Sequence, residues 1–517
     1  MQDFRNLMRK TRSATQILVG LTLASLLLPG VTLADLTVAS PFTDNAVLQR
    51  DMAVPVWGTA DAGSTVTVKF NKQTKSSVAN AEGRWSVQLD AMLADAKPQR
   101  LKVSDTKSTI SFGNVLVGEV WICSGQSNMA FVVNKSPEVK QLIPKAKNIR
   151  CFTVKKSVAL TEQDRLEGKW VEKHPDSAVA FSFAYFLEQA GDVPVGIILT
   201  CWGSSSIEAW MPRDMVETVP HFKTMMEEFD ADTENLAAIN AILDGPRPWG
   251  QKNDIFLRRQ TNILYNAMIH PLIPYACRGL VWYQGERNTQ SMFGMQKTPW
   301  YHRHSGMLKY GHTLKAWIQR YRKAWRADEM QFMIVMLPGY FKPIRTGPKK
   351  GAEHPETHSW SWMRESQLKA LELPHTSVVN TIDLGDIKNI HPKDKLPIGQ
   401  RLALLAERDT LEQDVEADGP MMERVAQQGK QLTVHFDHAK GLKTKDGTAP
   451  RAFWLADDSA QWVKADAKLK GQTVLLSSPK LKKPLYVRYA FAGKPDVNLV
   501  NEAGLPAFPF RTDSFKP

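Results

Sequence analysis

The sequence has 517 residues, enough for one large domain with smaller ones beside it. A hydrophobic share of 43% and a charged share of 23% are ordinary for a globular protein and exclude a disordered or fibrous chain. The formal net charge of +13 is spread along the chain, which favours loose association with anionic glycans or surfaces, and we expect no nucleic-acid partner.

The first 34 residues predict an export signal. A basic start is followed by the apolar run from Ile17 to Leu28 and by small residues ending at Ala34. A membrane anchor is the alternative, but Pro29 closes the run short of the roughly 20 residues that a span requires. We therefore expect a mature periplasmic or extracellular protein without a membrane span. Cleavage would lower the formal charge from +13 to +10.

Four cysteines follow the predicted signal: Cys123, Cys151, Cys201 and Cys277. In an oxidising compartment they could form up to two disulfides, and buried free thiols are the alternative, which the sequence leaves open. Their spacing fits no zinc motif, and we expect neither a metal nor a cofactor. The oligomeric state is not predicted.

Residues 35–113 predict a small β-sandwich. Short alternating runs such as Val54–Trp57 and Thr65–Phe70 are separated by turn residues. A second region of short β-runs begins after residue 411 and continues to residue 517. We expect this second region to pack on the rest of the protein.

Residues 114–411 predict an α/β domain with a doubly wound, mainly parallel sheet. Buried apolar runs alternate there with helical stretches, of which 314–325 and 398–406 are the clearest. The expected strands are 115–122, 195–200, 279–283, 332–337 and 377–382. Residues 212–257 are charged and predict an irregular insertion across the mouth of the sheet.

Four short motifs follow predicted strands, where ligands bind in open α/β sheets. Ser124-Gly125-Gln126-Ser127-Asn128 places a hydroxyl on a tight turn, as nucleophiles require. Thr200-Cys201-Trp202-Gly203 offers a glycine N–H, and Gln284-Gly285-Glu286-Arg287-Asn288 offers an amide donor, both suited to an oxyanion. Ile390-His391-Pro392 supplies an imidazole that can serve as a base.

The four motifs, in this order, resemble the SGNH hydrolase superfamily and, within it, the sialate O-acetylesterase family of carbohydrate esterases. Further stretches similar to that family cover almost the whole mature chain; they are Asn45–Arg50, Pro55–Gly58, Val117–Cys123, Ile207–Trp210, Met268–Leu272, Arg364–Gln367, Val487–Ala490 and Gly504–Arg511. The resemblance implies an SGNH-type fold and the removal of acetyl groups from a carbohydrate through an acyl-enzyme.

Carried over by resemblance, Ser127 is the expected nucleophile and His391 the expected general base. The N–H groups of Ser127 and Gly203 and the side chain of Asn288 are the expected oxyanion hole. Gln126, Glu286 and Trp210 are candidates for substrate binding, although Glu286 also fits the role of a structural carboxylate.

The third member of a catalytic triad departs from the family pattern. The acid is expected two or three residues before the histidine, where this sequence has Asn389 and Lys388. Asp386 is the candidate acid, with Asp383 and Asp394 the other nearby carboxylates. A Ser–His dyad oriented by a main-chain carbonyl is the alternative.

Three functions remain open from the sequence. The first is hydrolysis of O-acetyl esters on sialic acid or another acetylated glycan. The second is glycan binding without hydrolysis on an esterase scaffold, and the third is acetyl transfer to another sugar.

Overall fold

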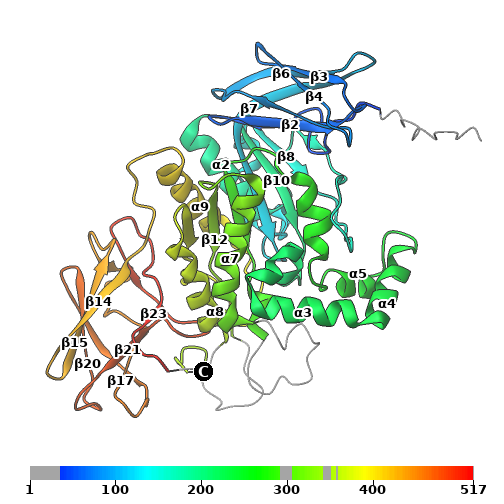
Figure 1. Cartoon of the computed structure of the whole chain (residues 1–517). Coiled ribbons are helices and arrows are strands. Elements are labelled where there is room, and N and C mark those ends of the chain that lie inside the picture. Colours follow the sequence, from blue (N-terminus) through cyan, green and yellow to red (C-terminus); the bar gives the residue numbers. More distant parts are fainter. Residues whose placement is uncertain (1–34, 291–305, 342–350, 357–358, 516–517) are drawn as a thin grey trace, which may run out of the picture.

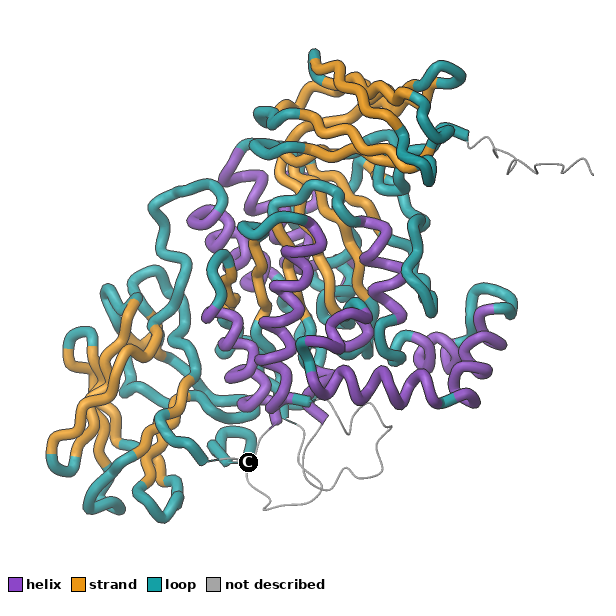
Figure 2. Tube along the Cα trace, viewed as in Figure 1, coloured by secondary structure: helices purple, strands orange, loops and turns teal. Residues whose placement is uncertain are grey.

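A central sheet lies between two regions built from strands (Figure 1). The structure is a computed structural model that describes residues 35–290, 306–341, 351–356 and 359–515. The predicted export signal lies outside these residues. Figure 2 shows helices flanking the central sheet, and strands and loops at its two sides.

The central sheet is parallel, apart from one short strand at its edge. Its strand order is β13-β12-β11-β7-β10-β8-β9, and only β9 runs antiparallel to its neighbour. The strands are β7 (Thr109–Gly125), β8 (Ile149–Thr153), β9 (Trp170–Val171), β10 (Val195–Cys201), β11 (Gly279–Tyr283), β12 (Gln331–Val335) and β13 (Thr376–Val379). This parallel sheet confirms the α/β class. The sequence could predict it because strands buried on both faces are continuous apolar runs.

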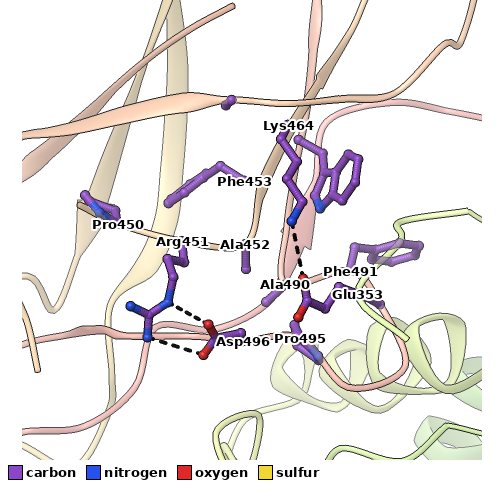
Figure 3. A pocket seen from close by; sticks show the side chains of 13 residues that line it. Glu353, Pro450, Arg451, Ala452, Phe453, Lys464, Ala490, Phe491, Pro495 and Asp496 are labelled. Carbon is purple, nitrogen blue, oxygen red and sulfur yellow. Dashed lines mark hydrogen bonds and ion pairs between the residues drawn. The ribbon is translucent and has the colours of Figure 1, made fainter. Parts of the chain in front are cut away.

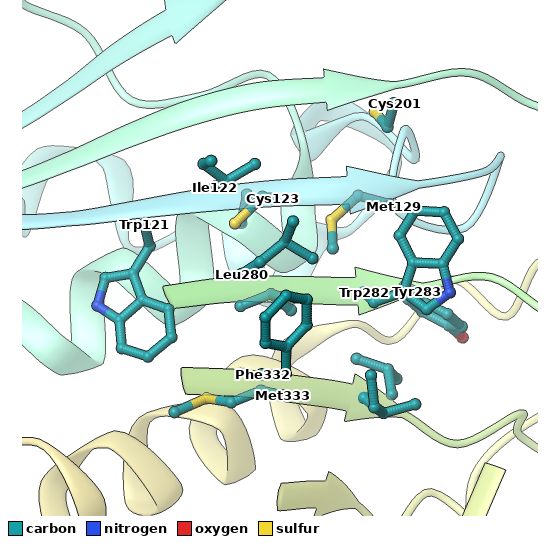
Figure 4. Packing of buried hydrophobic residues seen from close by; sticks show 14 of the residues in the cluster. Trp121, Ile122, Cys123, Met129, Cys201, Leu280, Trp282, Tyr283, Phe332 and Met333 are labelled. Atoms are coloured by element: carbon teal, nitrogen blue, oxygen red, sulfur yellow. The ribbon is translucent and has the colours of Figure 1, made fainter. Parts of the chain in front are cut away.

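Helices cover both faces of this sheet. They include α2 (Ala178–Gly191), α7 (Met307–Trp325), α8 (Ser359–Leu368) and α9 (Leu396–Asp409). Trp121 of β7 pairs in register with Gly279, so Trp282, three residues further along β11, points to the opposite face. Trp121 meets Phe183 of α2 with ring centroids 5.3 Å apart, and Trp282 meets Trp317 of α7 at 4.6 Å. Figure 4 shows Trp121 and Trp282 among the buried side chains along β7 and β11.

Strand β7 belongs to two regions at once. Its first half pairs with β6 of the N-terminal region, and its second half lies between β10 and β11. The N-terminal strands are β1 (Val47–Gln49), β2 (Val54–Thr59), β3 (Thr65–Phe70), β4 (Gln73–Val78), β5 (Arg84–Leu89) and β6 (Asp95–Ser104). The domain boundary that we predict at residue 113 therefore falls inside a continuous strand.

The C-terminal region contains two four-stranded sheets and one two-stranded pair. Its strands are β14 (Met421–Gln428), β15 (Gln431–Asp437), β16 (Lys443–Thr444), β17 (Phe453–Ala456), β18 (Val463–Lys464), β19 (Asp466–Lys470), β20 (Thr473–Ser477), β21 (Tyr486–Tyr489), β22 (Leu499–Val500) and β23 (Phe510–Arg511). The buried guanidinium of Arg364 in α8 donates to the carbonyls of Ala492 and Gly493 at 2.6 and 2.8 Å. This contact ties the C-terminal region to the central domain.

The insertion is helical, and the prediction that residues 212–257 are irregular was wrong. It contains η4 (Arg213–Glu217), α3 (Pro220–Ala231), α4 (Thr233–Leu243) and α5 (Gln251–Leu257). Its charges lie largely on the solvent side, while α3 buries Phe222, Met226 and Phe229. Pro220 starts α3, and the Asp232 side chain caps α4 by accepting from the N–H of Asn235.

Shorter helical turns complete the described chain: η1 (Val133–Lys135), α1 (Pro137–Lys140), η2 (Ile143–Lys145), η3 (Ile207–Trp210), η5 (Tyr265–Ile269), η6 (His270–Leu272), η7 (Glu286–Gln290) and η8 (Lys369–Glu372). The sequence left open whether the four cysteines form disulfides or are buried free thiols. In the structure all four are buried free thiols. Within the described ranges, no helix has the length and apolar character needed to cross a membrane.

Candidate active site

The carboxyl ends of β7, β10 and β11 meet at one edge of the sheet. The N–H of Gln126 donates to the carbonyl of Tyr283, and the N–H of Trp202 donates to the carbonyl of Gly125, each at 3.0 Å. Gly125 has φ of 134°, and a Cβ there would lie 2.2 Å from the Tyr283 carbonyl oxygen. Only glycine fits this position, which explains the sharp turn that carries Ser127.

Ser127 and His391 form a hydrogen-bonded pair. His391 Nε2 lies 2.8 Å from Ser127 Oγ, although the two residues are 264 positions apart in the sequence. His391 lies in the loop between β13 and α9 and is partly buried. Burial, followed by the charges of Lys395 and Lys135, lowers the pKa of His391 below its ordinary value. A neutral imidazole at this distance can accept the hydroxyl proton.

Gly203 lies against Ser127. A Cβ built on Gly203 would be 3.2 Å from the Ser127 Cβ, so the missing side chain leaves room beside the hydroxyl. Gly203 follows β10 by two residues, as predicted for a strand-end position.

Asn288 is held on both ends of its side-chain amide. Its Oδ1 accepts from the N–H of Ile207 at 3.1 Å and from Gln284 Nε2 at 2.8 Å. Its Nδ2 donates to the carboxylate of Glu208 at 3.0 Å. Gln284 also donates to Gln126 Oε1 at 3.2 Å, which connects Asn288 to the turn that carries the serine.

The structure does not bring Asp386 to His391. Asp386 is exposed, and its Oδ1 accepts from the N–H groups of Lys388 and Asn389 at 2.7 and 3.0 Å. These bonds form a local turn and lower the pKa of Asp386. Our choice of Asp386 as the orienting acid therefore has no supporting contact, because its carboxylate caps its own turn.

The two other nearby carboxylates also have different partners. Asp383 forms ion pairs with Arg401 and Lys445, and although burial opposes it, these cations lower its pKa to about 2. Asp394 accepts from the N–H of Leu396. Among the residues that the structure describes, no carboxylate forms a hydrogen bond with His391.

The loop of His391 is fixed through its main chain. Asn389 Oδ1 accepts from the N–H of His391 at 2.9 Å, and Asn128 Nδ2 donates to the carbonyl of Ile390 at 3.0 Å. Asn128 directly follows Ser127, so its amide joins the turn that carries Ser127 to the loop that carries His391. This role of Asn128 was not predicted from the sequence.

A buried lysine and a buried carboxylate hold Asn128 from either side. Lys395 Nζ donates to Asn128 Oδ1 at 2.6 Å, and Asn128 Nδ2 donates to Glu286 Oε1 at 2.5 Å. Burial lowers the pKa of Lys395 to about 7 and raises the pKa of Glu286. Lys395, which is fully buried four residues after His391, was also missed, since a lone lysine at the start of a helix ordinarily faces solvent.

The three residues predicted to bind substrate are internal. Trp210 is 0% exposed, and its indole N–H donates to Ser205 Oγ. Gln126 and Glu286 are each 4% exposed and bond to neighbouring side chains within the protein. These bonds support the strand-end loops, so no exposed surface at these side chains favours the substrate-binding role, which stays a prediction.

A separate cavity of about 190 Å³ lies in the C-terminal region (Figure 3). Two ion pairs join residues that line it, one between Arg451 and Asp496 and one between Lys464 and Glu353. It contains none of the residues around Ser127. Within the described ranges, no group of three or more His, Cys, Asp or Glu side chains could hold a metal ion.

Comparisons with known proteins relate the chain to carbohydrate esterases. Residues 117–244 match the family described as "Carbohydrate esterase, sialic acid-specific acetylesterase". A carbohydrate acetylesterase from Xanthomonas citri, known from its crystal structure, is 30% identical with a TM-score of 0.77, over 93% of this chain and 100% of that one. The sialate O-acetylesterase of Mus musculus is 26% identical over 88% of this chain and 90% of its own length. The Homo sapiens enzyme is 24% identical over 83% and 82%.

The parallel sheet with its flanking helices and strand-built regions has the fold of an SGNH-type hydrolase, and the comparisons place the protein among hydrolases that act on ester bonds. The chain belongs to the sialate O-acetylesterase family of carbohydrate esterases.

Proposed function

We propose that this protein hydrolyses O-acetyl esters on sugars through an acyl-enzyme on Ser127. The observation that carries the proposal is the 2.8 Å contact between Ser127 Oγ and His391 Nε2 at the carboxyl edge of the sheet. Gly203 beside the hydroxyl and Asn288 in the adjoining network support it.

In the first half-reaction, Ser127 Oγ attacks the acetyl carbonyl carbon while His391 Nε2 takes the hydroxyl proton. The carbonyl oxygen becomes an oxyanion, for which the N–H groups of Ser127 and Gly203 and the Nδ2 of Asn288 are the donors. The C–O bond to the sugar then breaks, and His391 returns the proton to the leaving sugar hydroxyl. In the second half-reaction, His391 deprotonates water, which attacks the acyl carbon and releases acetate and Ser127.

We propose O-acetylated sialic acid, or another acetylated glycan, as the substrate. The names of the mouse and human relatives support the first, and the name of the Xanthomonas citri relative supports the broader class. Acetate release from a panel of O-acetylated sialic acids and acetylated polysaccharides would choose between them. Adding acceptor sugars and searching for acetylated products by mass spectrometry would reveal transfer in place of hydrolysis.

We further propose that the mature protein is periplasmic or extracellular. The basis is the basic, apolar and small-residue pattern of residues 1–34. N-terminal sequencing of the protein recovered from its source cells, fraction by fraction, tests both export and cleavage.

Replacing Ser127 by Ala tests the role of the nucleophile. We expect Ser127→Ala to lower kcat for p-nitrophenyl acetate by at least about 10⁴-fold, because the acyl-enzyme can no longer form. Ser124→Ala is a matched control, since the Ser124 hydroxyl is buried three residues earlier and has no hydrogen-bond partner among the described residues. We expect that variant to keep nearly full activity. Substantial turnover by a folded Ser127→Ala protein would overturn the assignment.

A further inference from the structure

A buried carboxylate lies directly behind the amide of Asn288. Glu208 is in η3, two residues before Trp210, and is 1% exposed. Both of its carboxylate oxygens lie within hydrogen-bond distance of Asn288 Nδ2, at 3.3 and 3.0 Å. The hydrogen bonds described for the Glu208 carboxylate include none to Ser127 or His391, and the proposed reaction assigns it no step.

The partners of Asn288 leave its amide one orientation. Its Oδ1 faces two donors, the N–H of Ile207 and Nε2 of Gln284, so the Nδ2 end must face the carboxylate. Rotating the amide by half a turn would point the Asn288 oxygen at Glu208 and Nδ2 at the two donors. An amide nitrogen carries two hydrogens, so the proposed reaction requires one of them for Glu208 and the second for the oxyanion.

The insertion supplies the second partner of Glu208. His221 of α3 is buried, and its Nε2 lies 3.5 Å from Glu208 Oε1. Burial raises the pKa of Glu208, but the hydrogen bond and charge of His221, with the amide of Asn288, outweigh burial and lower it. An ionised Glu208 can only accept hydrogen bonds, which reinforces the same orientation of Asn288.

We propose that Glu208 is a positioning residue for the oxyanion donor Asn288. This inference rests on the proposed function, in which Asn288 Nδ2 stabilises the tetrahedral oxyanion. A donor that is fixed before the reaction contributes more than one that must reorient, because the charge appears only in the transition state. Glu208 would therefore act on kcat and leave KM nearly unchanged.

The first test compares two replacements of similar size at position 208. Glu208→Gln keeps an oxygen acceptor for Asn288, so kcat for p-nitrophenyl acetate should stay within about tenfold of the wild type. Glu208→Leu removes every acceptor and should lower kcat by about 10²- to 10³-fold, the usual cost of one oxyanion donor. If Glu208→Leu does not fold, Glu208→Ala carries the same expectation.

The second test repeats the substitution in protein that lacks the amide. Asn288→Ala should itself cost about 10²- to 10³-fold in kcat, and adding Glu208→Leu should cost less than about threefold more. A merely structural role would reduce kcat equally in both backgrounds. Equal losses in the two backgrounds, or no loss in Glu208→Leu alone, would overturn the inference.

A matched control separates catalysis from stability. Glu188 in α2 is likewise buried, at 4% exposed, and its carboxylate accepts from the main-chain N–H groups of Lys147 and Asn148. Glu188→Leu should lower the thermal unfolding midpoint while leaving kcat per folded molecule unchanged. The Ser127→Ala result is independent of these measurements, so failure of the positioning role and failure of the nucleophile give different outcomes.

Discussion

The proposed oxyanion side, around Asn288, and the proposed base side, around His391, are held in different ways. On the oxyanion side, the reacting group of Asn288 is itself fixed, because its side chain bonds to Ile207, Gln284 and Glu208. On the base side, the backbone N–H of His391 donates to the side chain of Asn389, while the His391 ring contacts Ser127 Oγ. The described carboxylates do not bond to that ring.

This difference indicates which reacting group must be held in a fixed position before the reaction. An oxyanion donor must stand ready before charge develops, and buried side chains supply that preorganisation. An imidazole that shuttles a proton between Ser127, the leaving hydroxyl and water has several partners in turn. A fixed backbone and a neutral ring meet that need, and the cationic surroundings of His391 favour the neutral ring.

Among the further changes that compare the two sides, the largest expected effect tests the close fit at Gly203 on the oxyanion side. Gly203→Ala places a methyl carbon 3.2 Å from the Ser127 Cβ, which is tighter than an ordinary contact and lies beside the reacting hydroxyl. We expect kcat for p-nitrophenyl acetate to fall by about 10- to 100-fold, since small displacements of reacting groups are costly. The thermal unfolding midpoint should change little.

Gly250→Ala is the matched control for that substitution, because a Cβ there would have no atom within 4 Å. It should leave kcat unchanged. Wild-type turnover by Gly203→Ala would show that the oxyanion side tolerates more movement than its hydrogen bonds indicate.

The next effect concerns pH and tests the cationic base side. The groups whose charges act on His391 are Lys395 and Lys135, and both disfavour the imidazolium. Because the neutral ring is the base, kcat/KM should rise as pH increases through the pKa of His391. Lys395→Met removes one positive charge, so the pKa of His391 should rise and the acidic limb of the profile should move to higher pH.

Lys393→Met controls for the loss of a charge in the same loop. Lys393 is exposed two residues from His391 and is absent from the groups that shift its pKa. Its profile should match that of the wild type. An acidic limb that stays in place in Lys395→Met, or moves to lower pH, would contradict the role given to Lys395.

Much of the fold could be predicted because parallel strands carry a strong signal. The runs around Ile122, Ile198 and Val281 are apolar on both faces, and only a sheet covered on two sides explains them. The helices of the insertion were not predicted because charged residues dominate its composition. The apolar positions Phe222, Met226 and Phe229 were the available signal for its first helix, at helical spacing.

The residues of the site also differ in whether the sequence could predict them. Ser127, Gly203, Asn288 and His391 follow strands or lie beside a helix start, where sequence position alone indicates that they meet. The supporting residues could not be found this way. Glu208, Lys395 and Asn128 act through buried contacts with side chains distant in sequence, and a single charged or polar residue does not reveal whether it is buried.

The smallest expected effect is the sharpest test of the base side. If Asp386 oriented the imidazole, as in a serine-protease triad, its loss would cost on the order of 10⁴-fold in kcat. The structure predicts a change of less than about threefold for Asp386→Asn, measured with p-nitrophenyl acetate. Asparagine keeps the Oδ1 that accepts from Lys388 and Asn389, so the turn before His391 should persist while the charge is removed. A 100-fold or greater loss of kcat, in protein with an unchanged unfolding midpoint, would mean that the Asp386 carboxylate moves to His391 during turnover. The contrast between the two sides would then hold only for the resting enzyme.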